Sequence, residues 1–321
     1  MTPIGAVLFS LALLAPGVAD AQADEWPSRP IRAVAPLAAG TGADVIARIV
    51  LNQLSVQLRQ PIVIENKGGA GGTLGAAMVA KAEPDGYTLM AGTPSHTIAP
   101  AIYPNLPYDT ARDFIAVAPF GSVPTALVVA PSKGIKTVQE LVAAAKAKPG
   151  SISYASAGIG STTHLTAERF RLSAGFTAVH VPFRGGGFQP DVMAGRVDFA
   201  FSPVAVSVPN IRDDKLVALA VSGRKRAAAL PQVPTTLEAG YADSDYVVWV
   251  GLFVPARTPP EIVARLHAET RKALQTPSVR ERLIGLDVDP MEMTQAEFGA
   301  YVDAEIANNA ALTKAVGIAP N

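Results

Sequence analysis

Short apolar runs alternate with amphipathic segments along most of this 321-residue chain. The first apolar run covers residues 31–36, and in the following segment, residues 43–59, apolar side chains recur at three- and four-residue spacings. That spacing puts them on one face of a helix. Repeated strand-then-helix order is typical of mainly parallel sheets covered by helices. The pattern therefore predicts an α/β fold.

Two such strand-and-helix units follow one another. The first is predicted to have strands at residues 31–36, 61–65 and 87–92 and helices at 43–59 and 73–81. The second is predicted to have strands at residues 125–130, 151–156, 176–182, 197–201 and 215–221 and helices at 138–146 and 163–172. A strand within 246–255 and helices at 260–274 and 294–314 complete the chain. If the strand returns the chain to the first unit, lobe 1 contains residues 24–122 and 250–321, and lobe 2 is an insertion of residues 123–249.

Residues 1–23 have the pattern of a secretory signal peptide. An apolar stretch from Ile4 to Ala15 is followed by Pro16 and Gly17 and then by small residues, with Ala21 and Ala23 at the expected cleavage site. A buried core helix is the alternative. No later stretch reaches the roughly 18 consecutive apolar residues of a membrane helix. We therefore expect a mature chain that starts near Asp24 and lies in the periplasm.

The charge pattern indicates a small-molecule partner. The chain has 27 Lys and Arg against 27 Asp and Glu, without a block of like charges. The sequence therefore lacks the cluster of positive charge that binding to nucleic acid or to a membrane surface usually requires. Cysteine is absent, which excludes disulfides, thiolate metal sites and thiol nucleophiles. The four histidines lack metal-binding spacing, so neither a metal nor a cofactor is expected.

The first candidate binding feature is a glycine turn between a predicted strand and helix, with the sequence ENKGGAGGTLG at residues 65–75. A helix start behind such a turn binds anions through free backbone N–H groups. We expect the amides of Ala70, Gly71, Gly72 and Thr73 to face a carboxylate. The glycines do not match the dinucleotide or P-loop patterns. The alternative is a turn that only lets helix and strand pack closely.

A similar turn, ASAGIGSTTHL at residues 155–165, occurs in the second unit. Ser156, Gly160, Ser161 and Thr162 are candidate ligand contacts here, although serine and threonine at a helix start are often simple N-caps. A third turn, PFRGGG at residues 182–187, adds Arg184 as a guanidinium for the ligand or as a solvated side chain. The first two turns, one per lobe, are expected to face each other across a cleft.

No catalytic constellation is found. Ser156 lacks the glycine that a nucleophile elbow would place at Tyr154, and the pair Ser161 and His164 has no evident third member. The sequence therefore does not favour an enzyme.

The chain resembles a known family, the Bug receptors, which are periplasmic solute receptors of tripartite tricarboxylate transporters. The resemblance covers nearly all of the mature chain and rests on motifs in the family's order, among them QPIVIENKGGAGG, PDGYTLMAGT, LPYDTARDF, ISYASAGIGSTTHL, VPFRGGG and MAGRVDFAF. It implies a two-lobed Venus-flytrap fold in a monomeric receptor. It also implies capture of a small organic acid, held through backbone groups and water, and delivery to membrane transporter subunits. Some relatives instead signal through a partner such as a sensor kinase, and a periplasmic enzyme is the remaining alternative.

The turns and the resemblance together predict one set of ligand-binding residues: Leu37, Thr41, Gly42, Ala70, Gly71, Gly72, Thr93, Ser95, Ser156, Gly160, Ser161, Thr162, Arg184, Gly185 and Ser202. Two positions depart from the family pattern. The segment LAAGTGAD, residues 37–44, lacks the proline-rich start of many relatives. Ser202 stands where relatives often have an acid that meets a ligand's amino group. The expected ligand is therefore a di- or tricarboxylate, a hydroxy acid or an aromatic carboxylate rather than an amino acid.

Overall fold

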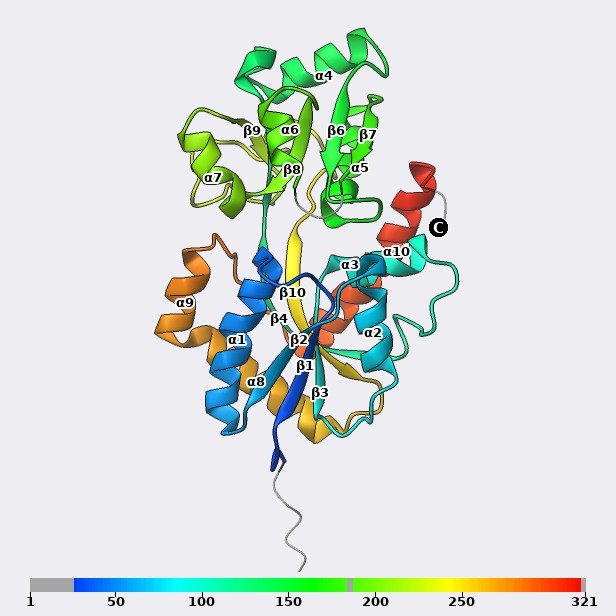
Figure 1. The fold of residues 1–321 in the computed structure, drawn as a ribbon, viewed down its shortest axis with the longest axis vertical. Helices are drawn as coiled ribbons and strands as arrows, with labels where there is room; N and C mark the ends of the chain where they lie inside the picture. Colours follow the sequence, from blue (N-terminus) through cyan, green and yellow to red (C-terminus); the bar gives the residue numbers. More distant parts are fainter. Residues whose placement is uncertain (1–25, 184–186, 319–321) are drawn as a thin grey trace, which may run out of the picture.

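The computed structural model describes residues 26–183 and 187–318, which form two α/β bodies joined end to end (Figure 1). We call the body that contains the first strand lobe 1 and the other lobe 2. Each is built on a five-stranded sheet flanked by helices. The predicted two-lobed α/β fold is confirmed. The predicted signal peptide, residues 1–23, lies outside the described residues.

Lobe 1 is assembled from both ends of the described chain. Its N-terminal elements are β1 (Ile31–Ala35), α1 (Gly42–Leu58), β2 (Ile62–Asn66), the 3-10 turn η1 (Ala70–Gly72), α2 (Thr73–Ala80), β3 (Thr88–Gly92), α3 (Pro94–Ile102) and β4 (Phe114–Val123). Its C-terminal elements are β10 (Val248–Pro255), α8 (Pro260–Gln275), α9 (Pro277–Ile284) and α10 (Gln295–Ala315).

Lobe 2 contains the middle of the chain. Its elements are β5 (Thr125–Val129), η2 (Pro131–Lys133), α4 (Val138–Ala147), β6 (Ser153–Ser156), α5 (Thr162–Ala174), β7 (Val179–Pro182), α6 (Gln189–Met193), β8 (Phe199–Pro203), α7 (Val204–Arg212) and β9 (Val217–Val221). The chain passes between the lobes where β4 leads into β5 and again where it enters β10 (Figure 1).

The two sheets have equivalent strand orders, β2-β1-β3-β10-β4 and β7-β6-β8-β5-β9. Each is mainly parallel, as predicted, but each contains one antiparallel strand, β10 in lobe 1 and β5 in lobe 2. These are the two strands that enter directly from the opposite lobe. A parallel neighbour needs a crossover connection that returns the chain to the same end of the sheet, and these strands have none within their own lobe.

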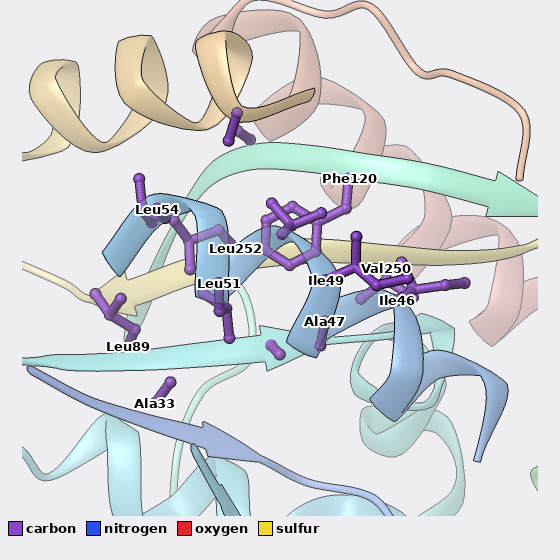
Figure 2. Packing of buried hydrophobic residues seen from close by; sticks show 14 of the residues in the cluster. Ala33, Ile46, Ala47, Ile49, Leu51, Leu54, Leu89, Phe120, Val250 and Leu252 are labelled. Atoms are coloured by element: carbon purple, nitrogen blue, oxygen red, sulfur yellow. The ribbon is translucent and has the colours of Figure 1, made fainter. Parts of the chain in front are cut away.

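The core of lobe 1 shows why the periodicity of the first helix predicted its position. The helix α1 spans Gly42–Leu58, against the predicted 43–59, and buries Ile46, Val50 and Leu54 at four-residue spacing. Its apolar face packs on the sheet, where the labelled side chains of α1 lie close to those of β1, β3, β4 and β10 (Figure 2). Burying each such side chain contributes roughly 1.5–3 kcal/mol.

Three elements of lobe 1 were not predicted: β4, α3 and α9. The helix α3 contains Pro100, and β4 contains Pro119, so both sequences lack an uninterrupted pattern. Among the described residues, no helix combines the length and the apolar character needed to cross a bilayer.

Candidate functional site

The loop between β1 and α1 is held by one buried carboxylate. Asp44 is 2% exposed, and its oxygens accept hydrogen bonds from Gly40 N (2.9 Å), Arg48 Nε (2.9 Å) and Asn66 Nδ2 (2.8 Å). Burial would raise the pKa of Asp44, but the hydrogen bonds from Arg48, Asn66 and Gly40 together lower it below its usual value. The carboxylate thus clamps the loop to the sheet edge.

The three predicted site residues on this loop take different positions. Thr41 is the N-cap of α1, with Oγ1 accepting from Asp44 N at 3.4 Å, and Gly42 is the first helical residue. The carbonyl oxygen of Leu37 accepts from Asn66 Nδ2 at 3.3 Å. Thr41 and Gly42 are exposed. The clamp therefore orients all three residues.

Asp44→Asn is expected to lower the free energy of unfolding at neutral pH by roughly 1–3 kcal/mol, because a buried donor set loses its charged acceptor. The pKa of Asp44 is lowered in the folded protein, so its contribution is present above the unfolded value of 3.8 and is lost as the pH falls through the folded value. Urea unfolding should show a difference from the parent that shrinks below pH 3.8. Exposed Asp303→Asn is the control, and equal effects of both substitutions would contradict the clamp.

The lobe-1 turn consists of four consecutive residues with positive φ: Gly69 (110°), Ala70 (47°), Gly71 (67°) and Gly72 (92°). For Ala70 this is a strained conformation, of the kind found at binding sites. Gly72 N donates to Gly69 O at 2.9 Å, and the amide of Thr73 donates to Ala70 O. The expectation that the amides of all four residues 70–73 face a ligand is therefore wrong. Those of Ala70 and Gly71 remain, without an acceptor among the described residues.

Close packing explains two other glycines of this segment. A Cβ at Gly72 would lie 2.7 Å from Pro36 O, and one at Gly75 would lie 2.7 Å from Lys67 O. Gly71 differs, because it is exposed and the three atoms nearest to its Cβ would all belong to the side chain of Tyr103. The packing interpretation holds for Gly72 and Gly75, whereas Gly71 is exposed.

A small cavity in lobe 1 brings four of the predicted residues together: Gly71, Gly72, Thr93 and Ser95. His96 and Tyr108 also line it. His96 is 5% exposed, and neither of its ring nitrogens has a hydrogen-bond partner among the described residues. Burial lowers the pKa of His96 to about 3, so the ring is neutral near pH 7.

The lobe-2 turn leads into α5. Gly158 and Gly160 have φ values of +124° and +73°. Ser161 is the N-cap, with Oγ accepting from His164 N at 3.3 Å, so the capping interpretation is confirmed for this residue. Ser161 is half-buried and Thr162, in the first helical turn, is 9% exposed. This places both hydroxyl residues at the N-terminus of a 13-residue helix.

Two stacked histidines support this turn from inside lobe 2. The rings of His164 and His180 lie 8° from parallel with centroids 3.9 Å apart. Gly160 N donates to Nδ1 of His164 (3.1 Å), and Nε2 of His180 lies 2.6 Å from Ser156 Oγ. Because Nδ1 of His164 accepts, the ring must be neutral. Burial, His180 and Arg171 lower the pKa of His164 to about 3.

Ser156 and Ser202 are buried and bonded within the protein. Ser156 Oγ lies 3.1 Å from Gly158 N as well as close to His180. Ser202, 1% exposed, accepts a hydrogen bond from Gln189 Nε2 at 2.8 Å. Both hydroxyls are therefore held by partners within lobe 2 and are not exposed. The predicted contacts Arg184 and Gly185 lie outside the described residues.

The end of α3 touches both glycine turns. A Cβ at Gly71, in lobe 1, would lie 3.0 Å from Oη of Tyr103, and one at Gly160, in lobe 2, would lie 3.0 Å from Cγ1 of Ile102. Since Ile102 and Tyr103 are adjacent in the chain, the two turns lie within one small region where the lobes meet.

The supporting role of the histidines is not visible in metal-binding or catalytic spacing, which none of them has. The available signal was position: His164 and His96 each stand in the first turn of a helix that follows a candidate loop. Within residues 26–183 and 187–318, no group of three or more His, Asp or Glu side chains is placed to hold a metal ion.

Residues 46–318 match the family model described as tripartite tricarboxylate transporter family receptor. The chain belongs to this family. BugT of Bordetella pertussis is 32% identical over 320 residues, which cover 99% of this chain and 98% of the relative. A UPF0065 protein from the tcbD-tcbE intergenic region of Pseudomonas sp. strain P51 is 36% identical over 281 residues, 87% of this chain and 84% of the relative.

Solved structures of the family share the fold. Rpa4515 of R. palustris, with adipate, has a TM-score of 0.83 at 32% identity, covering 92% of this chain and 100% of that chain. MatC of Rhodopseudomonas palustris, with bound malate, has a TM-score of 0.78 at 32% identity, covering 89% and 99%. The periplasmic binding protein BugD has a TM-score of 0.79 at 30% identity, covering 92% and 100%. The family is thus one of periplasmic solute receptors rather than of enzymes.

Proposed function

We propose that this receptor is exported to the periplasm, captures a small organic carboxylate between its two lobes and delivers it to the membrane subunits of a tripartite tricarboxylate-type transporter. The observation that carries the proposal is the contact of both glycine turns with Ile102 and Tyr103 at the end of α3. One ligand of a few carbon atoms can then reach groups from both lobes.

The chemistry of the two turns suits a carboxylate. In lobe 1 the amides of Ala70 and Gly71 are donors ahead of α2, and in lobe 2 the N-terminus of α5 carries Ser161 and Thr162. The partial positive charge of a helix N-terminus stabilises an anion by about 0.3–1 kcal/mol at an exposed site, and by more where water is excluded. A ligand with a carboxylate at each end would satisfy both lobes.

The ligand class we propose is a dicarboxylate, tricarboxylate, hydroxy acid or aromatic carboxylate. Adipate in Rpa4515 and malate in MatC support this class. Ser202 supports it as well, because it is a neutral residue bonded to Gln189, and an ammonium group of an amino acid would find no carboxylate at that position.

Two measurements test the proposal: which carboxylate the receptor binds, and whether that ligand brings the lobes together. Thermal shift over a panel of carboxylates identifies a ligand, because binding to the folded state alone raises the melting temperature. Small-angle scattering with that ligand should then show a smaller radius of gyration, because contacts to both turns stabilise only the closed arrangement. Absence of any stabilising carboxylate, or binding without compaction, would contradict capture between the lobes.

The double variant Ser161→Ala and Thr162→Ala should bind at least tenfold more weakly and compact less at matched ligand concentration. Ser161 is also an N-cap, and losing a cap costs about 1 kcal/mol of stability. Thr294→Ala is the matched control, since Thr294 caps α10 with a capping box. It should lose stability and keep affinity. Equal affinity of the double variant and the parent would remove these hydroxyls from the proposed site.

A further inference from the structure

A second cavity, of about 430 Å³, lies on lobe 1 and shares no residue with the cavity beside the glycine turn. It opens between the end of α8, the helix α9 and the segment that follows α9, and its floor is β4. The lining residues that matter for its chemistry are Phe120, Arg271, Arg280, Leu283, Val288 and Glu292. The volume falls in the range of small-molecule sites, about 300–1,000 Å³.

The wall formed by the segment after α9 is anchored to the sheet. Asp289 and Ser122 exchange two backbone hydrogen bonds of 2.7 and 2.8 Å. At Gly121 a Cβ would lie only 2.5 Å from Val288 Cγ1, so this strand and the wall approach as closely as glycine permits. Because the wall is fixed, the cavity is formed before any ligand enters it.

The lining combines an apolar floor with two guanidinium groups. Phe120, Leu283 and Val288 are nearly fully buried, so the deep surface is hydrocarbon. Arg271 and Arg280 both line the cavity, and among the described residues neither makes a side-chain hydrogen bond or an ion pair within 4.0 Å. Arg271 does lie near enough to Glu297 to add, after the hydrogen bonds from Thr294, to the lowering of the pKa of that exposed carboxyl. Glu292 also lines it, which leaves one net positive charge among the three charged groups.

We propose that this cavity binds an amphiphilic monocarboxylate, with the carboxylate at Arg271 and Arg280 and the apolar chain on the floor. A guanidinium presents paired N–H donors that match a carboxylate. Each buried methylene of the chain adds about 0.8 kcal/mol. Glu292 disfavours a second carboxylate in the same space. The cavity therefore selects an acid with one charged end, unlike the cleft between the lobes.

Decanoate is the probe for this site, used with the full-length mature receptor in titration calorimetry. Decanoate should bind, while decanol, without the carboxylate, and decanedioate, with a second one, should bind at least tenfold more weakly. The double variant Arg271→Gln and Arg280→Gln should reduce decanoate affinity at least tenfold. The single variant Arg280→Gln, at an exposed residue, should also reduce the affinity. Arg282→Gln, on α9 outside the cavity, is the charge-matched control and should bind as the parent does.

The cleft variant Gly71→Val separates this site from the one between the lobes. It should keep decanoate binding while losing the cleft ligand, so failure of one proposal does not imply failure of the other. Three results would overturn the inference: no heat of binding with decanoate, equal affinity of the parent and the double arginine variant, or loss of decanoate binding in Gly71→Val.

Discussion

Gly71→Val should weaken ligand binding more than 100-fold while leaving a cooperative unfolding transition. Gly71 has φ of +67°, where a β-branched residue is strongly disfavoured. Its Cβ would press on Oη of Tyr103 at 3.0 Å, so the turn must move. The N–H groups of Ala70 and Gly71 would then no longer point toward the carboxylate of the ligand. A 100-fold change corresponds to about 2.7 kcal/mol, within reach of two misplaced donors to a carboxylate.

Gly134→Val provides a closely matched control for backbone strain. Gly134 has φ of +68°, its Cβ would meet nothing within 4 Å, and it lies after η2 in lobe 2. Both variants should lose stability in urea through backbone strain, Gly71→Val somewhat more because of its contact with Tyr103, and only Gly71→Val should lose affinity in calorimetry. If the two variants bind equally well, Gly71 has only a structural role.

Acidification from pH 6.5 to pH 5 should lower the free energy of unfolding by about 1.6 kcal/mol through His96 alone. Burial lowers the pKa of His96 to about 3 from 6.5. The unfolded chain therefore binds a proton between these values that the folded protein does not, so stability falls as the pH falls through this window. The pKa of His164 is also lowered to about 3, first by burial, and adds a loss of the same sign.

His96→Leu isolates this effect. The imidazole packs against Phe114 and Phe253 without a hydrogen-bond partner among the described residues, so an apolar side chain of similar size should be tolerated. Urea unfolding of His96→Leu should show a shallower loss of stability between pH 6.5 and 5 than that of the parent. Leu54→Ala, in the cluster between α1 and the sheet, should lower stability equally at every pH. Parallel pH profiles for the parent and His96→Leu would contradict a neutral buried His96.

The candidate site could be predicted where it depends on local backbone chemistry. The glycine-rich segments predicted turns at two helix starts, and Gly71 and Gly160 within them have positive φ, a conformation that few other residues adopt. The roles of the buried polar groups could not be read in the same way. Asp44 is an acid in the first turn of α1, and only the tertiary structure shows that it also accepts a hydrogen bond from Asn66 of β2. Ser156 looked like a ligand contact, but it bonds to His180, 24 residues away.

The sequence by itself determined the α/β class, the two lobes and the glycine turns at helix starts. Apolar periodicity and the φ preferences of glycine act over a few residues, so they can be read without knowing the rest of the chain. Only the tertiary structure decided the antiparallel entry of β5 and β10, the stacked pair of His164 and His180, and the meeting of both turns on Ile102 and Tyr103. These contacts join residues far apart in sequence, and their free energy depends on burial and geometry that exist only once both lobes have packed.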